Sequence, residues 1–176
     1  LSYVGELGWE IYIPVKNAKK IYDTIIETGK NHRLIHAGAH AMDIMRMEKK
    51  YLHWGHDISP EENPFEAGLG WITKLAKGDF IDKTLLTSQK EEGVSRKLIA
   101  FELVDKGIPR KDYLIIDEQG NEIGYVTSGT MSPSMKIPIG LGYVSKEYAK
   151  IDTEIYVEIR NKAVKAKIVK LPFYKN

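Results

Sequence analysis

Apolar residues recur with two different periods along the chain, and the change between them falls near Gly93. Before this glycine, helical spacing dominates. Apolar side chains at positions 21, 22, 25 and 26 predict a helix over 17–30, with Gly29 near its end. The same period returns over 39–50 and, in a shorter form, over 82–92. The pattern therefore predicts three helices in the first half of the chain.

Two segments of this first half lack the helical period and predict strands. Residues 9–14 alternate between apolar and polar side chains, whereas 69–75 resemble a short buried strand. Between them, Ser59 and Glu62 have the spacing of a capping box, with a proline at the first helical position. Asn63, which also precedes a proline, could start the same turn instead.

After Gly93 the side chains alternate with period two and are rich in β-branched and aromatic residues. Tight turns at 118–121 and 161–162 separate some of these runs. Six such strands predict a small antiparallel barrel or sandwich. The fold class is therefore α+β, and we expect one domain over 1–92 and a second over 93–176. The predicted strands are 97–104, 113–117, 122–127, 139–144, 154–160 and 163–171.

The composition narrows the possible functions. The chain has 176 residues, 43% hydrophobic and 28% charged, which suits a globular protein with a sizeable core. A net charge of +2, with lysines interleaved among acids, does not indicate a nucleic-acid partner. The absence of cysteine excludes disulfides and thiolate catalysis. No apolar run approaches the roughly 20 residues that a membrane span requires, so we expect no membrane partner.

The first segment, Ser2-Tyr-Val-Gly-Glu-Leu-Gly-Trp-Glu-Ile-Tyr12, sets two carboxylates and three aromatic rings among two glycines. Glycine lets the backbone approach a flat ligand closely. A carboxylate accepts two parallel N–H bonds from an amidine-like edge, and an aromatic ring can cover the ligand's face. These features suit a pterin or a purine. A strand–turn–strand with solvated glutamates is the alternative. The segment begins at residue 1 without an initiator methionine, so we expect the chain to be the downstream portion of a larger polypeptide.

Other chemistry receives less support from the sequence. His53 and His56, followed by Asp57, have i, i+3 spacing that could form a metal pair, but no third ligand is evident. Loop histidines with ordinary hydrogen bonds are the alternative that we favour, and we expect no metal. Ser128 and Ser132 lack the context of a hydrolase nucleophile. No dinucleotide or Walker fingerprint is present.

Several segments together resemble one family, the glycine cleavage T-protein, a folate-dependent aminomethyltransferase, and the related C-terminal region of dimethylglycine and sarcosine dehydrogenases. Each motif is weak alone, but their order and spacing cover nearly the whole chain. The matching segments are Ser2-Tyr-Val-Gly-Glu-Leu-Gly-Trp-Glu10, Asp43-Ile-Met-Arg-Met-Glu48, Trp54-Gly-His-Asp-Ile58, Pro64-Phe-Glu-Ala-Gly-Leu-Gly-Trp71, Lys77-Gly-Asp-Phe-Ile81, Gly107-Ile-Pro-Arg110, Val126-Thr-Ser-Gly-Thr-Met-Ser-Pro133 and Val169-Lys-Leu-Pro-Phe-Tyr174.

The resemblance implies a folate-binding unit of ferredoxin-like α+β halves followed by a C-terminal β-barrel, of which this chain resembles the second half plus the barrel. It implies tetrahydrofolate as the cofactor, which captures a one-carbon unit and becomes 5,10-methylenetetrahydrofolate. The amine donor is carried on a lipoyl carrier protein in T-proteins and produced by an upstream flavin domain in the dehydrogenase relatives. The family's catalytic aspartate lies in an N-terminal half, so no catalytic residue is assigned here. A non-catalytic folate-binding or interaction module, or the tail of a flavin-dependent dehydrogenase, are the alternatives.

The resemblance also implies site residues. Glu10 matches the glutamate that binds the amide and amino edge of the pterin. Tyr3 and Tyr12 resemble positions that line the folate site, and Trp71 resembles an aromatic position near the ligand, with core packing as the alternative. Trp9, on the opposite side of the predicted strand from Glu10, is expected in the core.

One departure concerns the second predicted helix. Classical T-proteins carry an arginine just before the aspartate that matches Asp43, whereas this chain has Met42 at that position. The dehydrogenase relatives also carry an apolar residue there. Arg46, one helical turn further on, could supply the guanidinium to folate; the alternative is a surface ion pair beside Glu48. Members of the family work in the bacterial cytoplasm or the mitochondrial matrix, so either location is expected.

Overall fold

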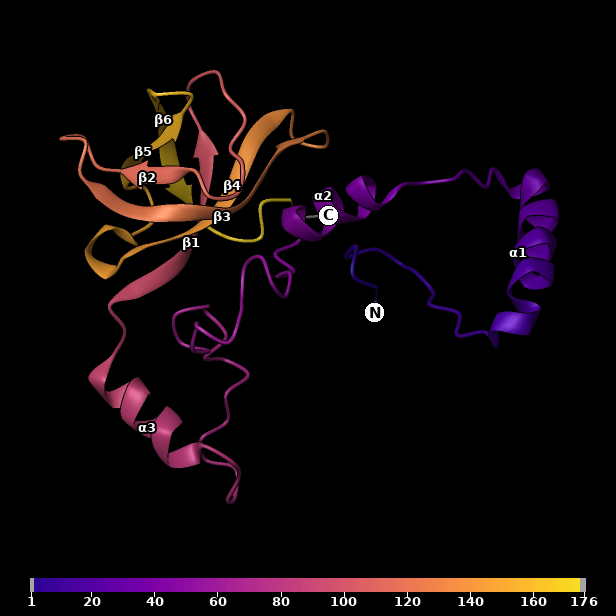
Figure 1. The fold of residues 1–176 in the computed structure, drawn as a ribbon, viewed down its shortest axis with the longest axis horizontal. Helices are drawn as coiled ribbons and strands as arrows, with labels where there is room; N and C mark the ends of the chain where they lie inside the picture. The colour runs from indigo at the N-terminus through magenta and orange to yellow at the C-terminus, as the bar shows by residue number, and fades with distance from the viewer. Residues whose placement is uncertain (1, 175–176) are drawn as a thin grey trace. The chain divides into compact units, whose positions relative to one another are not determined.

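The structure is a computed structural model that describes residues 2–174 (Figure 1). The chain divides into two compact units, Leu1–Tyr51 and Leu52–Asn176. This division rests on packing and does not test the expected domain boundary at 92/93, which stays a prediction. Within the described residues, no helix is both long and apolar enough to cross a membrane.

The first unit contains two α-helices, α1 over Val15–Gly29 and α2 over Ala39–Glu48, with a 3-10 turn over Lys30–His32 between them. Helix α1 follows Pro14, whose extended backbone is typical of the residue just before a helix. Both helices confirm the periodic pattern of the sequence. The α+β class is likewise confirmed by the helices and strands of the whole chain.

The two strands predicted in the first half are wrong. Residues 9–14 form no strand, and Trp9 is 86% exposed rather than in the core. Residues 69–75 form turns, in which Ile72 donates its backbone N–H to the carbonyl of Leu69. Alternation can be recognised in a sequence, but a strand exists only where a second strand supplies hydrogen bonds. No such partner lies opposite either segment among residues 2–174.

Ser59 and Glu62, which have capping-box spacing, form hydrogen bonds of the capping-box kind although no helix follows. The backbone N–H of Ser59 donates to Glu62 Oε2 at 2.8 Å, and Glu61 N donates to Ser59 Oγ at 3.1 Å. Asn63 repeats the arrangement with Glu66, because each backbone N–H donates to the other's side chain at 2.9 Å. Both alternative starts therefore occur as two successive turns. These two turns hold the carboxylates of Glu62 and Glu66 against the backbone of one short segment.

The second unit contains helix α3, Lys83–Glu92, and a closed six-stranded barrel with the strand order β1-β4-β3-β2-β5-β6 (Figure 1). Every pair of neighbouring strands is antiparallel. Helix α3 ends at Gly93, whose φ of 82° suits glycine, as predicted. The barrel is confirmed in preference to a sandwich. Its strands are β1 Arg96–Leu103, β2 Leu114–Ile116, β3 Glu122–Ser132, β4 Ile137–Ser145, β5 Glu154–Ile159 and β6 Lys162–Val169.

The barrel encloses the main apolar core, in which Phe101, Ile115 and Val126 are fully buried. Strand β3 is longer than the predicted strand over 122–127 and continues to Ser132. Its pairing with β4 shifts register between Val126 and Ser128, so Thr127 is the extra residue of a β-bulge. A bulge redirects a side chain, and this one brings a threonine hydroxyl to a buried position.

Candidate functional site

The N-terminal motif segment folds against the residues that follow α2. Gly5 has a φ of 70°, and a Cβ there would lie 2.4 Å from Lys49 Cγ, so glycine is required at this contact. Ser2 Oγ donates to the carbonyl of Glu6 at 2.6 Å. The carboxylate of Glu6 pairs with Lys49 Nζ at 3.2 Å. Of the segment's two carboxylates, Glu6 is thus structural.

Two of the predicted site residues, Tyr3 and Arg46, meet at Tyr51. The ring of Tyr3 stacks on that of Tyr51, with centroids 6.1 Å apart and planes 16° apart. Arg46 Nη1 donates to the Tyr51 carbonyl at 3.2 Å, and its Nε donates to Asp43 Oδ1 at 2.7 Å. Arg46 is 1% exposed, so its guanidinium forms this ion pair of the helix from a buried position rather than on the surface. Its role toward folate stays a prediction.

Glu10 and Tyr12 lie together, as expected for residues two apart in extended backbone. The Tyr12 hydroxyl donates to Glu10 Oε2 at 2.7 Å. This hydrogen bond, with the charge of Glu10, raises the pKa of Tyr12 and keeps the phenol protonated as a donor. Both side chains are exposed, and neither lines the two recorded cavities, which lie in the barrel. Their contact with a pterin stays a prediction.

Trp71, the remaining predicted site residue, belongs to the second unit. Its side chain is 68% exposed, so the alternative of core packing is wrong. It lies in the turn-rich segment between Ala67 and α3. Its role as a ring that covers the ligand stays a prediction.

The histidine pair and Asp57 adopt separate roles. The rings of His53 and His56 stack in parallel, with centroids 4.3 Å apart. Asp57 is fully buried: its Oδ2 accepts the backbone N–H of His53 at 2.9 Å, and its Oδ1 accepts the hydroxyl of Thr127 at 2.6 Å. Tyr143 donates its hydroxyl to the Asp57 carbonyl at 2.9 Å. Across residues 2–174, no three His, Cys, Asp or Glu side chains are grouped to hold a metal.

Arg96 forms a second polar centre that the sequence did not single out. Its guanidinium pairs with Glu62 Oε1 and Glu66 Oε1, both at 3.2 Å, and lies 5.0 Å from the centroid of the Tyr143 ring. Burial lowers the pKa of Arg96, but the hydrogen bond and charge of Glu66 outweigh it, so the net change is upward. Burial, followed by the charge of Glu62, raises the pKa of Tyr143. Asp57 and the Arg96 cluster thus both connect the 53–66 segment to the barrel strands.

Two family models match the chain in sequence order. The GCVT N-terminal domain matches residues 1–77, and the glycine cleavage T-protein C-terminal barrel domain matches residues 96–175. An aminomethyltransferase of Flavobacterium psychrophilum is 50% identical over 174 residues, which is 99% of this chain and 48% of the relative. One of Bacteroides thetaiotaomicron is 45% identical over 175 residues, with 99% and 48% coverage.

A solved structure agrees with the sequence comparisons. The crystal structure of glycine cleavage system aminomethyltransferase T from Bartonella henselae superposes with a TM-score of 0.85 at 27% identity. The match covers 92% of this chain and 45% of that protein. The chain spans about half the length of the curated relatives it matches. With both family models matched in order and the fold shared, the chain belongs to the glycine cleavage T-protein (aminomethyltransferase) family.

Proposed function

We propose that this chain is the folate-binding and barrel portion of an aminomethyltransferase that transfers a one-carbon unit to tetrahydrofolate and forms 5,10-methylenetetrahydrofolate. The observation that carries the proposal is the match of both family models, in order, together with 45–50% identity to proteins named aminomethyltransferase. These names favour the transferase over the dehydrogenase tail. A lipoyl carrier protein is the proposed partner that delivers the amine.

Glu10 is the proposed anchor of the pterin. Its Oε2 accepts one hydrogen bond, from Tyr12, and among residues 2–174 no partner is recorded for Oε1. A carboxylate oxygen has two lone pairs, so both oxygens keep the capacity to accept the parallel N–H donors of the pterin's amide and amino edge. Tyr12 fixes the orientation of the carboxylate. This geometry would reject rings that lack the donor pair.

The remaining predicted residues have separate proposed roles. Tyr3, already stacked on Tyr51, offers a flat aromatic surface. Trp71, whose side chain is 68% exposed, is proposed to cover the face of the ligand. Arg46 is already bound to Asp43 and Tyr51, so we propose that it positions the segment carrying Tyr51 and reaches folate only through it.

Isothermal calorimetry with tetrahydrofolate tests the anchor. Because the chain spans about half the length of its relatives, we expect weak binding. Glu10→Ala removes two charge-assisted hydrogen bonds and should lower the affinity by about tenfold or more. Glu27→Ala, which removes an exposed glutamate from α1, is the matched control and should leave the affinity unchanged. Equal affinities of the original chain and the Glu10 variant would remove Glu10 from the site.

Transfer is tested separately from binding. No catalytic residue is assigned in this chain, so we expect no turnover from it alone. Addition of the separately produced N-terminal half of the Flavobacterium psychrophilum relative, with an aminomethylated lipoyl carrier, should restore formation of methylenetetrahydrofolate. Folate binding without any restored transfer would favour the non-catalytic binding module. Turnover by the chain alone would contradict our assignment of the catalytic aspartate to another segment.

A further inference from the structure

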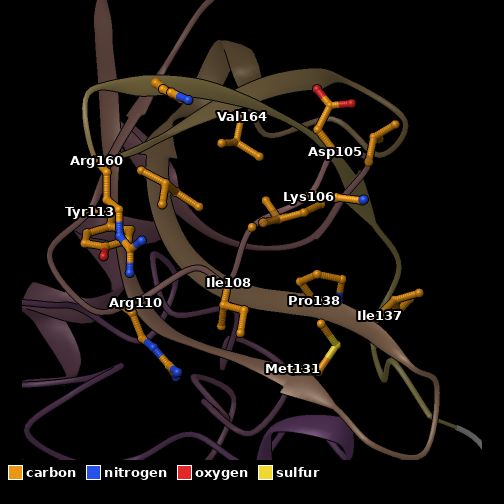
Figure 2. Close-up of a pocket in the computed structure, with 15 residues that line it drawn as sticks. Asp105, Lys106, Ile108, Arg110, Tyr113, Met131, Ile137, Pro138, Arg160 and Val164 are labelled. Carbon is orange, nitrogen blue, oxygen red and sulfur yellow. The ribbon is translucent and has the colours of Figure 1, made fainter.

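One end of the barrel contains a cavity of about 800 Å³ that the proposed function does not use (Figure 2). It lies where β1, β3 and β5 end and where β4 and β6 begin. The apolar residues of its lining form its floor: Leu103 and Val164 are buried, while Ile108 and Met131 are 37% and 40% exposed. Concave sites of this size, at the mouth of a barrel and with apolar floors, are typical of small-molecule binding.

The rim of this cavity is strongly basic. Lys106, Arg110, Arg160 and Lys162 line it, against one carboxylate, Asp105. Among residues 2–174, no ion pair is recorded for any of the four cations; Arg110 donates only to the Gly129 carbonyl, at 3.2 Å. In Figure 2, Arg110 and Arg160 lie on one side of the cavity with Tyr113, and Lys106 and Asp105 lie on the other.

Lysines on the outer face of β6 provide the contrast. Lys165 pairs with Glu154 at 2.8 Å, and Lys167 pairs with Asp152 at 2.7 Å. Within the described part of the chain, these two lysines of β6 are therefore each paired with a carboxylate, whereas the four cations around the apolar hollow are not. Like charges that gather without counter-charges repel one another, and a bound anion would relieve that repulsion.

The loop that carries two of these cations is held in place before any ligand arrives. A Cβ at Gly107 would lie 2.9 Å from Ile159 Cδ1, so the backbone packs directly on the floor. A Cβ at Gly129 would lie 2.4 Å from the carbonyl oxygen of Pro109, which shows how closely loop and β3 approach. A site with a fixed backbone loses less conformational entropy when it binds.

We propose that this cavity binds a small amphipathic anion, a carboxylate with a medium-length aliphatic chain. The chain would lie on the floor formed by Leu103, Ile108 and Val164. The carboxylate would lie between Arg110 and Arg160, because a guanidinium matches a carboxylate with two parallel hydrogen bonds. The concave, apolar floor favours a compact ligand over a nucleic-acid backbone, which needs an extended basic track. This proposal is independent of the proposed folate site.

Calorimetry of the full chain with decanoate, below its micelle concentration, tests the proposal. We expect saturable binding of one decanoate per chain, and at least about tenfold weaker binding of uncharged decyl maltoside. Arg110→Gln combined with Arg160→Gln should weaken decanoate binding by about tenfold or more. Lys165→Gln combined with Lys167→Gln removes the same charge from the outer face and should change the affinity by less than about twofold. Met131→Gln, at an exposed floor position, should also weaken binding.

Three results would overturn the proposal. Equal losses in the two double variants would show that overall charge, and not this cavity, attracts the anion. Equal affinity for decanoate and decyl maltoside would remove the role of the cations. Binding of a glutamate-rich peptide or of anionic vesicles in place of decanoate, sensitive to the same arginines, would assign the rim to a macromolecular partner instead.

Discussion

Thr127 donates a hydrogen bond of 2.6 Å to the carboxylate of Asp57 across 70 positions of the chain, and both side chains are buried. The bulge in β3 makes this bond possible, because Thr127 is the residue at which the register with β4 shifts. Tyr143, on β4, holds the carbonyl of the same aspartate. The Trp-Gly-His-Asp motif is therefore fixed to the barrel by a residue that the strand displaces from its regular pairing.

Thr127→Val tests this connection. Valine has a similar shape but no hydroxyl, so the buried carboxylate of Asp57 would lose this donor, at a cost of about 1–3 kcal/mol in the free energy of unfolding. Urea denaturation followed by circular dichroism measures the difference. Thr84→Val, at an exposed position of α3, is the matched control and should change stability by about 0.5 kcal/mol or less. Equal effects of the two substitutions would show that the bond contributes nothing specific.

Arg96 should stabilise the barrel more than a surface ion pair does. Its guanidinium forms ion pairs with Glu62 and Glu66, whose side chains are 7% and 12% exposed. Arg96→Met would leave both carboxylates without this partner, and we expect a loss of about 2 kcal/mol, between the values for exposed and buried pairs. Arg96→Lys should recover only part of it, because an ammonium cannot bind two carboxylates with the same fork.

Lys165→Met supplies the comparison for Arg96, since it breaks an exposed pair with Glu154 on the same barrel. We expect a loss of about 0–1 kcal/mol in the same urea titration. A loss for Arg96→Met no larger than that for Lys165→Met would mean that the Arg96 ion pairs stabilise the barrel no more than an exposed pair does.

The elements that the sequence predicted correctly are those with a local cause. Helices α1, α2 and α3 follow from a period that one segment carries by itself, and Gly93 ends the third through its own backbone preference. The six barrel strands alternate strongly, and each finds a neighbour. Residues 9–14 alternate as well, but pairing is a property of two segments, and no described segment pairs with them.

The same distinction applies to the candidate site. The meeting of Glu10 and Tyr12 could be predicted, because positions two apart share a side in extended backbone. The bond between Thr127 and Asp57 depends on a bulge, and the sequence around it, with its small and hydroxyl-bearing residues, resembles a loop. Arg96 has no local signal either, because its two glutamates lie 30 and 34 positions away. A polar residue inside a strand with buried neighbours is the one clue that could have indicated Thr127.

Gly140 is predicted to be irreplaceable for a steric reason. It faces Phe101 across the β1–β4 pairing, and a Cβ at position 140 would lie 2.2 Å from Cζ of that fully buried ring. Gly140→Ala should therefore lower the free energy of unfolding by about 1–3 kcal/mol or more through overpacking. Gly78→Ala is the control, because a Cβ there meets nothing within 4 Å. A Gly140 variant as stable as the Gly78 variant would mean that the ring moves away without cost.

Asp117 should make stability depend on acid pH. The side-chain amide of Asn121 donates to it at 2.9 Å, two backbone N–H groups donate at 2.8 and 2.9 Å, and together they hold the pKa of Asp117 below its ordinary 3.8. A lowered folded-state pKa gives stability that is present above the unfolded value and is lost as pH falls through the folded value.

The difference in unfolding free energy between the original chain and Asp117→Asn should therefore be largest near neutral pH. It should shrink below about pH 4, which urea titrations at several pH values would measure. Glu118→Gln removes one carboxylate from the same turn as a control. A difference for Asp117→Asn that stays constant through this pH range would show that the ionised carboxylate is not what the turn stabilises.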